Sequence, residues 1–166
     1  HRTTFEKLKI EKSFDLVLFS ESFQYVNIKK SLDKVSSLLN KNGRLLICDF
    51  FRQPGTGTKP LGGGHDWNVF QDNLKNYSFT NLIDIDITKE TARTYDLINK
   101  LIKDVAVPVR ELSSNYLSSQ YPRGMKFLKW YFDKKINRMN RIYFSGNMTG
   151  KMFNKLKTYR ILLYKT

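Results

Sequence analysis

The sequence predicts an α/β fold built around a mostly parallel sheet, and two observations lead to that class. First, two apolar runs, residues 16–19 and 45–48, are each long enough for one buried strand. Second, Leu32, Val35 and Leu38 recur between these runs at helical spacing, while lysine and serine side chains occupy the opposite helix face. A strand, an amphipathic helix and a second strand form a βαβ unit, in which the strands are parallel and the crossover is right-handed.

This βαβ unit, residues 14–51, determines where a ligand site is expected. Asn27 is expected to cap the start of the helix, and Asn42-Gly43 supplies the left-handed residue expected to end it. Ligands of such sheets bind outside the carboxyl ends of the strands. Those ends are Ser20-Glu21-Ser22 and Asp49-Phe50-Phe51. We therefore expect any active site at these two segments.

A loop rich in glycine and proline follows at residues 52–67. Its run Gly55-Thr56-Gly57-Thr58-Lys59 superficially suggests a phosphate-binding loop, but the spacing differs and no helix follows directly. Asp66 can cap a helix that reaches about Asn76 and buries Trp67, Phe70 and Leu74. The loop is therefore interpreted as a flexible connection at the active end of the sheet.

Residues 79–87 alternate as a strand with one wet face is expected to do. Asp84 and Asp86 are two residues apart and share a side of this strand. They are interpreted either as a carboxylate pair for metal or acid–base chemistry, or as strand residues that face solvent. The second interpretation is favoured.

Three helices are predicted between Thr88 and about Arg141. One carries an apolar stripe to Val105, Pro108 is expected to break the chain and start a second, and a third spans about Met125 to Arg141. The aromatic residues of the third helix cover more than one face. A short helix at 149–156 and a strand at 159–164 complete the predicted elements.

Composition narrows the class of protein. The 166 residues, 40% of them hydrophobic, suit one domain or a large piece of one. The segment at residues 1–12 is polar and basic without the apolar region of a signal peptide, and no apolar run reaches the length of a membrane span. One cysteine, Cys48, predicted within a buried strand, fits a reducing, cytoplasmic location, and two histidines argue against a zinc site.

The positive charge is concentrated in one region. The net charge is +14, and between Tyr121 and Arg160 eleven Lys and Arg residues accompany a single acid, Asp133. Such a surface attracts anionic partners, including nucleic acid, phospholipid and acidic carrier proteins. Thirteen asparagines beside the many lysines also allow a simpler interpretation, a solvated surface that reflects codon bias.

The order of elements resembles the C-terminal half of a class I S-adenosylmethionine-dependent methyltransferase. Phe14-Asp15-Leu16-Val17-Leu18 resembles the family's fourth strand, and the segment 38–47 resembles the turn into its fifth strand. The resemblance implies a partial Rossmann-like methyltransferase fold, with an antiparallel last strand and strand order fourth, fifth, seventh, sixth. It implies a single partial domain, 1–166, with its core at 1–87 and 145–166 and a helical lid insertion at 88–144.

The resemblance also implies S-adenosylmethionine as cofactor. The family's glycine-rich turn and the acid that holds the ribose are absent from this sequence and are expected before His1, so the N-terminal half of the domain is an expected partner. Thr4 and Phe5 occupy the position where many members place an acid and an aromatic residue against the adenine. Activity is accordingly expected of the intact protein and not of this chain alone.

Site residues are assigned from their place in this fold. Ser20 and Glu21 end the fourth strand and are expected to contact the cofactor, with Glu21 and His65 as candidate catalytic bases. Glu21 could equally be a surface residue, and His65 a loop residue bonded to backbone. The predicted substrate-binding residues, which could alternatively serve only packing, are Tyr25, Trp130, Tyr131 and Tyr143.

The leading predicted function is methyl transfer to a small organic or carrier-bound acceptor. The alternatives are an RNA methyltransferase that uses the basic 121–160 surface, and a non-catalytic half-domain that pairs with another subunit. No metal is expected to take part.

Overall fold

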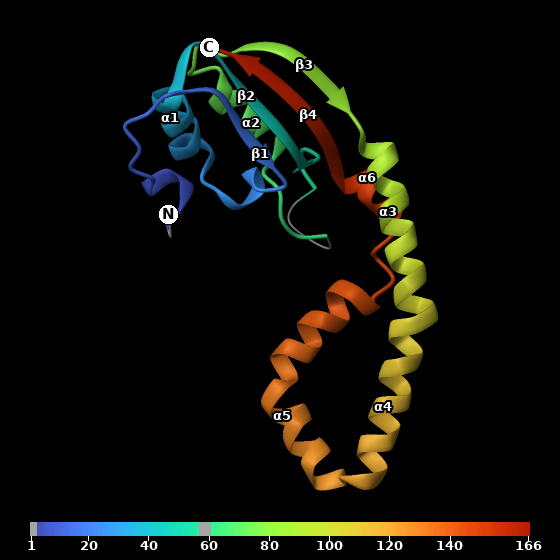
Figure 1. The fold of residues 1–166 in the computed structure, drawn as a ribbon. Helices are drawn as coiled ribbons and strands as arrows, with labels where there is room; N and C mark the ends of the chain where they lie inside the picture. Colours follow the sequence, from blue (N-terminus) through green and yellow to red (C-terminus); the bar gives the residue numbers. More distant parts are fainter. Residues whose placement is uncertain (1–2, 57–60) are drawn as a thin grey trace. The chain divides into compact units, whose positions relative to one another are not determined.

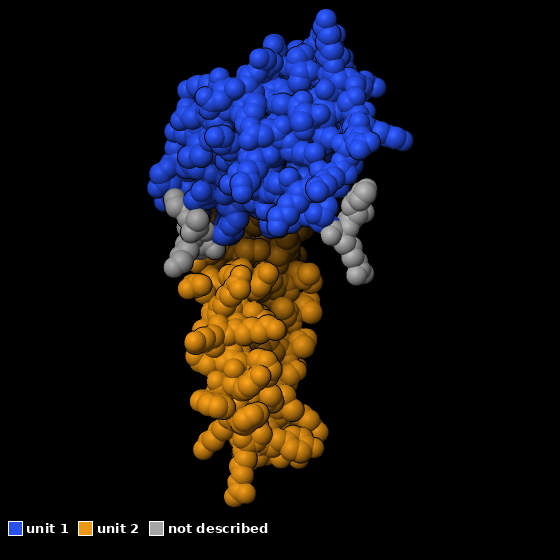
Figure 2. All heavy atoms as spheres, turned by 90° about the vertical axis from the view of Figure 1, so that its left-hand side faces the viewer, with its two compact units in different colours: residues 1–89, 154–166 blue, residues 90–153 orange. Residues whose placement is uncertain are grey.

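The computed structural model describes residues 3–56 and 61–166, so Gly57-Thr58-Lys59 of the glycine-rich loop lies outside the described residues. The chain forms two compact units, residues 1–89 with 154–166 and residues 90–153 (Figure 2). The first unit contains the sheet, and the second is helical (Figure 1).

Four strands form one sheet in the order β1-β2-β4-β3. The strands are β1 (Phe14–Ser20), β2 (Leu39–Arg52), β3 (Thr80–Asp86) and β4 (Lys157–Lys165). β1 is parallel to β2, and β4 runs antiparallel to both of its neighbours, β2 and β3. The predicted fold class and strand order are therefore confirmed, including the antiparallel last strand.

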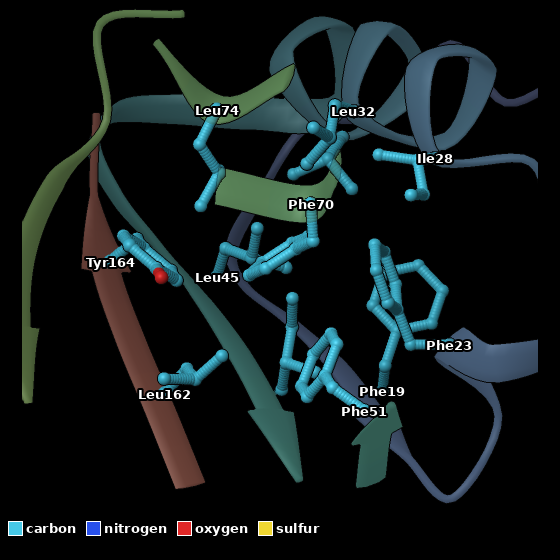
Figure 3. Packing of buried hydrophobic residues seen from close by; sticks show 12 residues of the cluster. Phe19, Phe23, Ile28, Leu32, Leu45, Phe51, Phe70, Leu74, Leu162 and Tyr164 are labelled. Atoms are coloured by element: carbon cyan, nitrogen blue, oxygen red, sulfur yellow. The ribbon is translucent and has the colours of Figure 1, made fainter. Parts of the chain in front are cut away.

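Two helices, α1 (Ile28–Leu38) and α2 (Trp67–Leu74), cover one face of this sheet (Figure 1). The core beneath them is aromatic: Phe23, Phe51 and Phe70 are fully buried and meet one another with ring centroids 4.8–6.4 Å apart (Figure 3). Fully burying such a side chain stabilises the fold by about 1.5–3 kcal/mol. Leu32 of α1 and Leu45 of β2 lie in the same cluster.

The start of each helix is capped as predicted. The side chain of Asn27 accepts from the amide of Lys30, and that of Asp66 accepts from the amides of Asn68 and Val69. The predicted end of α1 is wrong, however. The helix ends at Leu38, and Asn42, with φ 64°, lies instead in an irregularity of β2 where the pairing with β1 shifts register.

The opposite face of the sheet carries apolar side chains that no described element covers. We call it the open face. Leu18 pairs with Leu46 and Ile83 with Leu163, so one row of side chains crosses all four strands. The members of the open face with large exposure are Leu16 (49%), Leu18 (55%), Ile83 (41%) and Ile85 (50%).

The open face corrects two predictions. Every residue of β3 is exposed, so β3 has two exposed faces and not the single wet face predicted. Cys48, predicted within a buried strand, is only half-buried. Cys48 lies on the side of the sheet that α1 and α2 do not cover, whereas β3, at the edge of the sheet, is exposed even on the covered side.

The second unit contains α4 (Val107–Gln120), α5 (Pro122–Met139) and most of α3 (Thr88–Leu101) and α6 (Gly150–Leu156). Pro108 lies in the first turn of α4, so the predicted start of a second helix is confirmed, but the chain does not leave the helical conformation before it. A π-helical turn, Ile102–Ala106, joins α3 to α4, and Val107 donates to the carbonyl of Ile102. The wider turn lets the helix continue past a proline, which lacks the amide that a regular helix requires. In the described ranges, no helix has the length and apolarity needed to span a bilayer.

Candidate functional site

Glu21 is held by a hydrogen bond from a distant strand. It directly follows β1 with φ 49°, a left-handed conformation, and its amide donates to the carbonyl of Cys48 (2.9 Å). The Tyr159 hydroxyl of β4 donates to Glu21 Oε1 (2.7 Å) and lies 3.6 Å from Cys48 Sγ. Because β4 is antiparallel, its beginning lies at the carboxyl ends of β1 and β2, where the site was expected.

The Tyr159 hydroxyl keeps its proton, as a hydrogen-bond donor to Glu21 must. Burial and the hydrogen bond to Glu21 raise the pKa of the Tyr159 hydroxyl above its ordinary value. The hydroxyl therefore remains a donor at neutral pH. Glu21 itself is exposed, so its second carboxylate oxygen can accept from a ligand.

Asp49 is a buried carboxyl group in one of the two segments where the site was expected, although no individual role was predicted for it. It is 1% exposed and accepts from the amides of Gln24 (3.0 Å) and Phe50 (2.8 Å). Burial raises the pKa of Asp49, although these hydrogen bonds work in the other direction. Asp49 thus anchors the turn that follows β1. The sequence does mark Asp49 in one way: it alternates with Leu45, Ile47 and Phe51, so it is an acid on the covered face of a strand.

A lysine holds the glycine-rich loop at the same end of the sheet. Lys157 Nζ donates to the carbonyl oxygens of Gly62 and Gly63 (2.6 Å for Gly63) and lies 5.0 Å from the centre of the Phe50 ring. Burial, together with the charge of Arg52, lowers the pKa of Lys157 to about 8. No local pattern marks Lys157, because its partners are distant in sequence.

His65 and Tyr25 lie together in a groove of about 490 Å³ between the turn after β1 and helices α1 and α2. His65 Nε2 is 2.9 Å from the carbonyl oxygen of Phe23, and the two rings meet edge to face. A neutral His65 that donates from Nε2 leaves Nδ1 as the nitrogen able to accept a proton. The structure thus brings one predicted base and one predicted substrate residue into the same groove.

The remaining predicted cofactor residues lie near β1. Ser20 is exposed at the end of the strand. Phe5 belongs to a short 3-10 helix, Phe5–Lys7, and its ring packs 4.9 Å from that of Phe19, while Thr4 is exposed just before it. Much of the Phe5 ring is therefore engaged by the core. The cofactor roles of Ser20, Thr4 and Phe5 stay predictions.

The second unit contains a cavity of about 530 Å³ of its own. Leu117 and Arg110 of α4 and Met125 and Ile136 of α5 are among its lining residues. The guanidinium of Arg110 lies 4.6 Å from the centre of the Phe144 ring at the cavity wall. Trp130, Tyr131 and Tyr143, predicted to bind substrate, do not line this cavity, and they are 74%, 65% and 45% exposed.

Asp84 and Asp86 pair with Arg160 of β4, at 2.8 and 3.3 Å. Partial burial opposes ionisation of Asp86, but the hydrogen bonds from Thr88 and the charge of Arg160 outweigh it and lower the pKa of Asp86. The pair is therefore occupied by a cation of the protein itself. Within residues 3–56 and 61–166, no cluster of three His, Cys, Asp or Glu side chains is placed to hold a metal ion.

Several solved structures have a fold similar to that of this chain. The O-methyltransferase of a Brevibacillus brevis polyketide multienzyme, solved with S-adenosylhomocysteine, matches with 15% identity and a TM-score of 0.56, over 100% of this chain and 48% of its own. The geranyl diphosphate C-methyltransferase of Streptomyces coelicolor matches with 10% identity and a TM-score of 0.61, over 98% and 51%. The fold is that of the class I methyltransferases.

The methyltransferase fold alone does not determine the reaction. The cyclase SpnF matches with 15% identity and a TM-score of 0.55, over 99% of this chain and 54% of its own. This chain spans about half the length of the solved chains that it matches. No family model and no curated protein matches the sequence.

Proposed function

We propose that this chain is the acceptor-side half of an S-adenosylmethionine-dependent methyltransferase that acts on a small organic or carrier-bound acceptor. The observation that carries the proposal is the strand order β1-β2-β4-β3 with antiparallel β4, combined with an oriented carboxylate at its active end. Two methyltransferases with a similar fold were solved with S-adenosylhomocysteine, the product of methyl donation.

The residues at the active end suit one part of the cofactor. Glu21 offers an exposed carboxylate oxygen, held in place by Tyr159, that can accept from the ammonium group of the cofactor's amino acid portion. The exposed hydroxyl of Ser20 lies beside it in sequence. When bound, S-adenosylmethionine supplies an electrophilic methyl group. The described residues thus fit the amino acid end of the cofactor, and the other contacts require further protein.

Each unit offers a feature that could serve an acceptor: the first a base in a groove, and the second a cavity of its own. His65 Nδ1 can take a proton from an acceptor in the groove that it shares with Tyr25. The cavity of the second unit is lined by apolar and polar side chains, among which Arg110 and Lys129 outnumber the one acid, Asp133, and this suits an apolar acceptor with an anionic group. Because this cavity could hold an acceptor, we propose that residues 88–144 serve as the lid of the enzyme.

The open face of the sheet supports the proposal that an N-terminal half of the domain completes the enzyme. An exposed apolar surface that crosses four strands, beside the unpaired edge of β1, is a surface that soluble proteins normally cover. We propose that the N-terminal half of the domain packs there and supplies the glycine-rich turn. Activity is then a property of the complete protein.

Cofactor binding by the complete protein that contains this chain tests the proposal. Titration calorimetry with S-adenosylmethionine should show binding that weakens about tenfold in Glu21→Gln, because a charged hydrogen bond contributes about 1.5–3 kcal/mol. Glu11→Gln, which removes an exposed carboxylate outside the site, is the matched control and should bind as the parent does. Absence of binding to the complete protein would overturn the proposal. Transfer of a labelled methyl group to RNA would favour the RNA alternative.

A further inference from the structure

Helix α5 has two faces of different character. Met125, Lys129 and Ile136 lie at positions i, i+4 and i+11, and they face the cavity that α5 shares with α4. Phe127, Trp130 and Tyr131 lie on the opposite side of the helix and are 59%, 74% and 65% exposed. We call this opposite side the outer face of α5.

The outer face is also strongly basic. Its cations, all exposed, are Arg123, Lys126, Lys134, Lys135 and Arg138. Asp133, the one acid of α5, lies at the border between the cavity side and the outer face and accepts from the side-chain amide of Asn137 (3.0 Å). In the described part of the chain, none of these five cations takes part in an ion pair. Their charge is therefore available to an external anion.

The three aromatic rings form one cluster in the middle of this charge. The Phe127 ring lies 6.0 Å from the Tyr131 ring at an angle of 19° and 5.9 Å from the Trp130 ring. Tryptophan and tyrosine are the residues enriched at membrane–water interfaces, where an apolar body and a polar tip are both accommodated. Lysine and arginine beside them bind anionic lipid headgroups.

We propose that the outer face of α5 binds the surface of an anionic phospholipid bilayer. The helix lies in the plane of the interface, with the aromatic cluster at the headgroup level and the basic side chains against lipid phosphates. Charge complementarity selects the partner, because five cations of the outer face accompany a single carboxylate, Asp133, at its border. This inference is independent of methyl transfer, and it differs from a membrane span, for which α5 is too polar.

Single-stranded nucleic acid is the competing anionic partner. Bases bind such proteins by stacking on aromatic rings that are open on one face. In the outer face, Phe127 and Tyr131 are stacked on each other, which occupies part of the ring surface that bases would need. Three aromatic rings that already pack together can enter the headgroup region as one body. A bilayer is therefore favoured over single-stranded nucleic acid as the partner.

Vesicle sedimentation tests the proposal directly. The 166-residue chain is mixed with vesicles of phosphatidylcholine alone or with about 30% phosphatidylglycerol, at low and high salt. We expect sedimentation with the anionic vesicles, loss of binding as salt rises, and little binding to pure phosphatidylcholine. Equal binding to both vesicles would overturn the proposal, because it would indicate nonspecific adsorption through the open face of the sheet.

Two matched pairs of variants locate the binding surface. The variant K126Q/K134Q/K135Q should lower the partition coefficient about tenfold or more, whereas K9Q/K30Q/K41Q, with the same loss of charge elsewhere, should lower it far less. Trp130→Ser should weaken binding several-fold, whereas Tyr116→Ser, which alters another exposed aromatic residue, in α4, should not. Equal losses within either pair, or tighter binding to oligouridine RNA than to the anionic vesicles, would refute the bilayer assignment.

Discussion

The Tyr159 hydroxyl donates a 2.7 Å hydrogen bond to Glu21 Oε1, and the two residues are 138 positions apart in the sequence. This bond joins the end of β1 to the beginning of β4 across the intervening β2. It orients the carboxylate proposed to bind the cofactor. Tyr159 is therefore a positioning residue, and it acts through Glu21.

Tyr159→Phe removes only this donor. We expect the free energy of unfolding to fall by about 1 kcal/mol, because one partly buried hydrogen bond is lost. In the complete protein, affinity for S-adenosylmethionine should fall several-fold, and titration calorimetry measures that change. Tyr121→Phe, which alters an exposed hydroxyl in the second unit, is the control and should change neither quantity. An unchanged affinity in Tyr159→Phe would remove the positioning role.

Gly64 and Gly55 provide a matched pair of alanine substitutions. Both have a left-handed backbone, with φ +73° and +74°. A Cβ at Gly64 would lie 3.0 Å from Phe50 atoms, whereas a Cβ at Gly55 would meet nothing within 4 Å. Each alanine carries the backbone cost of about 1 kcal/mol, and Gly64→Ala should lose about 1–2 kcal/mol more because the loop must move. Urea unfolding measures the difference, and equal losses would contradict the close approach.

The lowered pKa of Lys157 predicts a pH dependence of stability. Because its pKa is about 8 in the folded protein against an ordinary 10.5, the folded state gives up this proton first. The contribution of Lys157 is complete above the unfolded pKa and is lost as pH falls through about 8. The free energy of unfolding should therefore rise from about pH 7 to 9.5.

Lys157→Met should abolish this rise, and Lys155→Met, an exposed neighbour, should keep it. The measurement is denaturant unfolding at several pH values below the range in which tyrosines ionise. A pH profile of Lys157→Met that is parallel to that of the parent would show that another group titrates.

Leu18 and Leu45 lie on opposite faces of adjacent strands and are 55% and 0% exposed. Leu45→Ala should cost about 2–5 kcal/mol, because it leaves a cavity in the core. Leu18→Ser should change the free energy of unfolding by only about 0.5 kcal/mol and should reduce self-association, measured by sedimentation velocity. In the complete protein the same Leu18→Ser should become destabilising if the open face is covered there. A Leu18→Ser that is neutral in both proteins would contradict the proposed packing.

Local signals predicted the βαβ unit well. The spacing of Leu32 and Val35 and the caps Asn27 and Asp66 depend on neighbours within a few residues, so the sequence displays them. The strand order came from the resemblance to a family and is confirmed. The continuation of helix past Pro108 was missed because a π-helical turn has no distinct residue pattern.

The contacts of the candidate site could not be predicted in the same way. Glu21, His65 and Tyr25 were selected by their place at strand ends and loops, but their partners were not. Tyr159 and Lys157 come from a strand far along the chain, and the pairing of that strand depends on the whole sheet. Asp49 lay in a predicted site segment, but its role in anchoring the turn after β1 was not predicted, because the sequence does not show which two amides donate to it.

The central place of β4 in the sheet determines when this domain can form during synthesis. β4 lies between β2 and β3, and Tyr159 is separated by 111 residues from Cys48, its neighbour on β2. Until the ribosome has released β4, β2 and β3 lack the strand that joins them, and their apolar side chains face solvent or a chaperone. Completion of the sheet must therefore follow translation of the whole helical segment, and contacts so distant in sequence are slow to form.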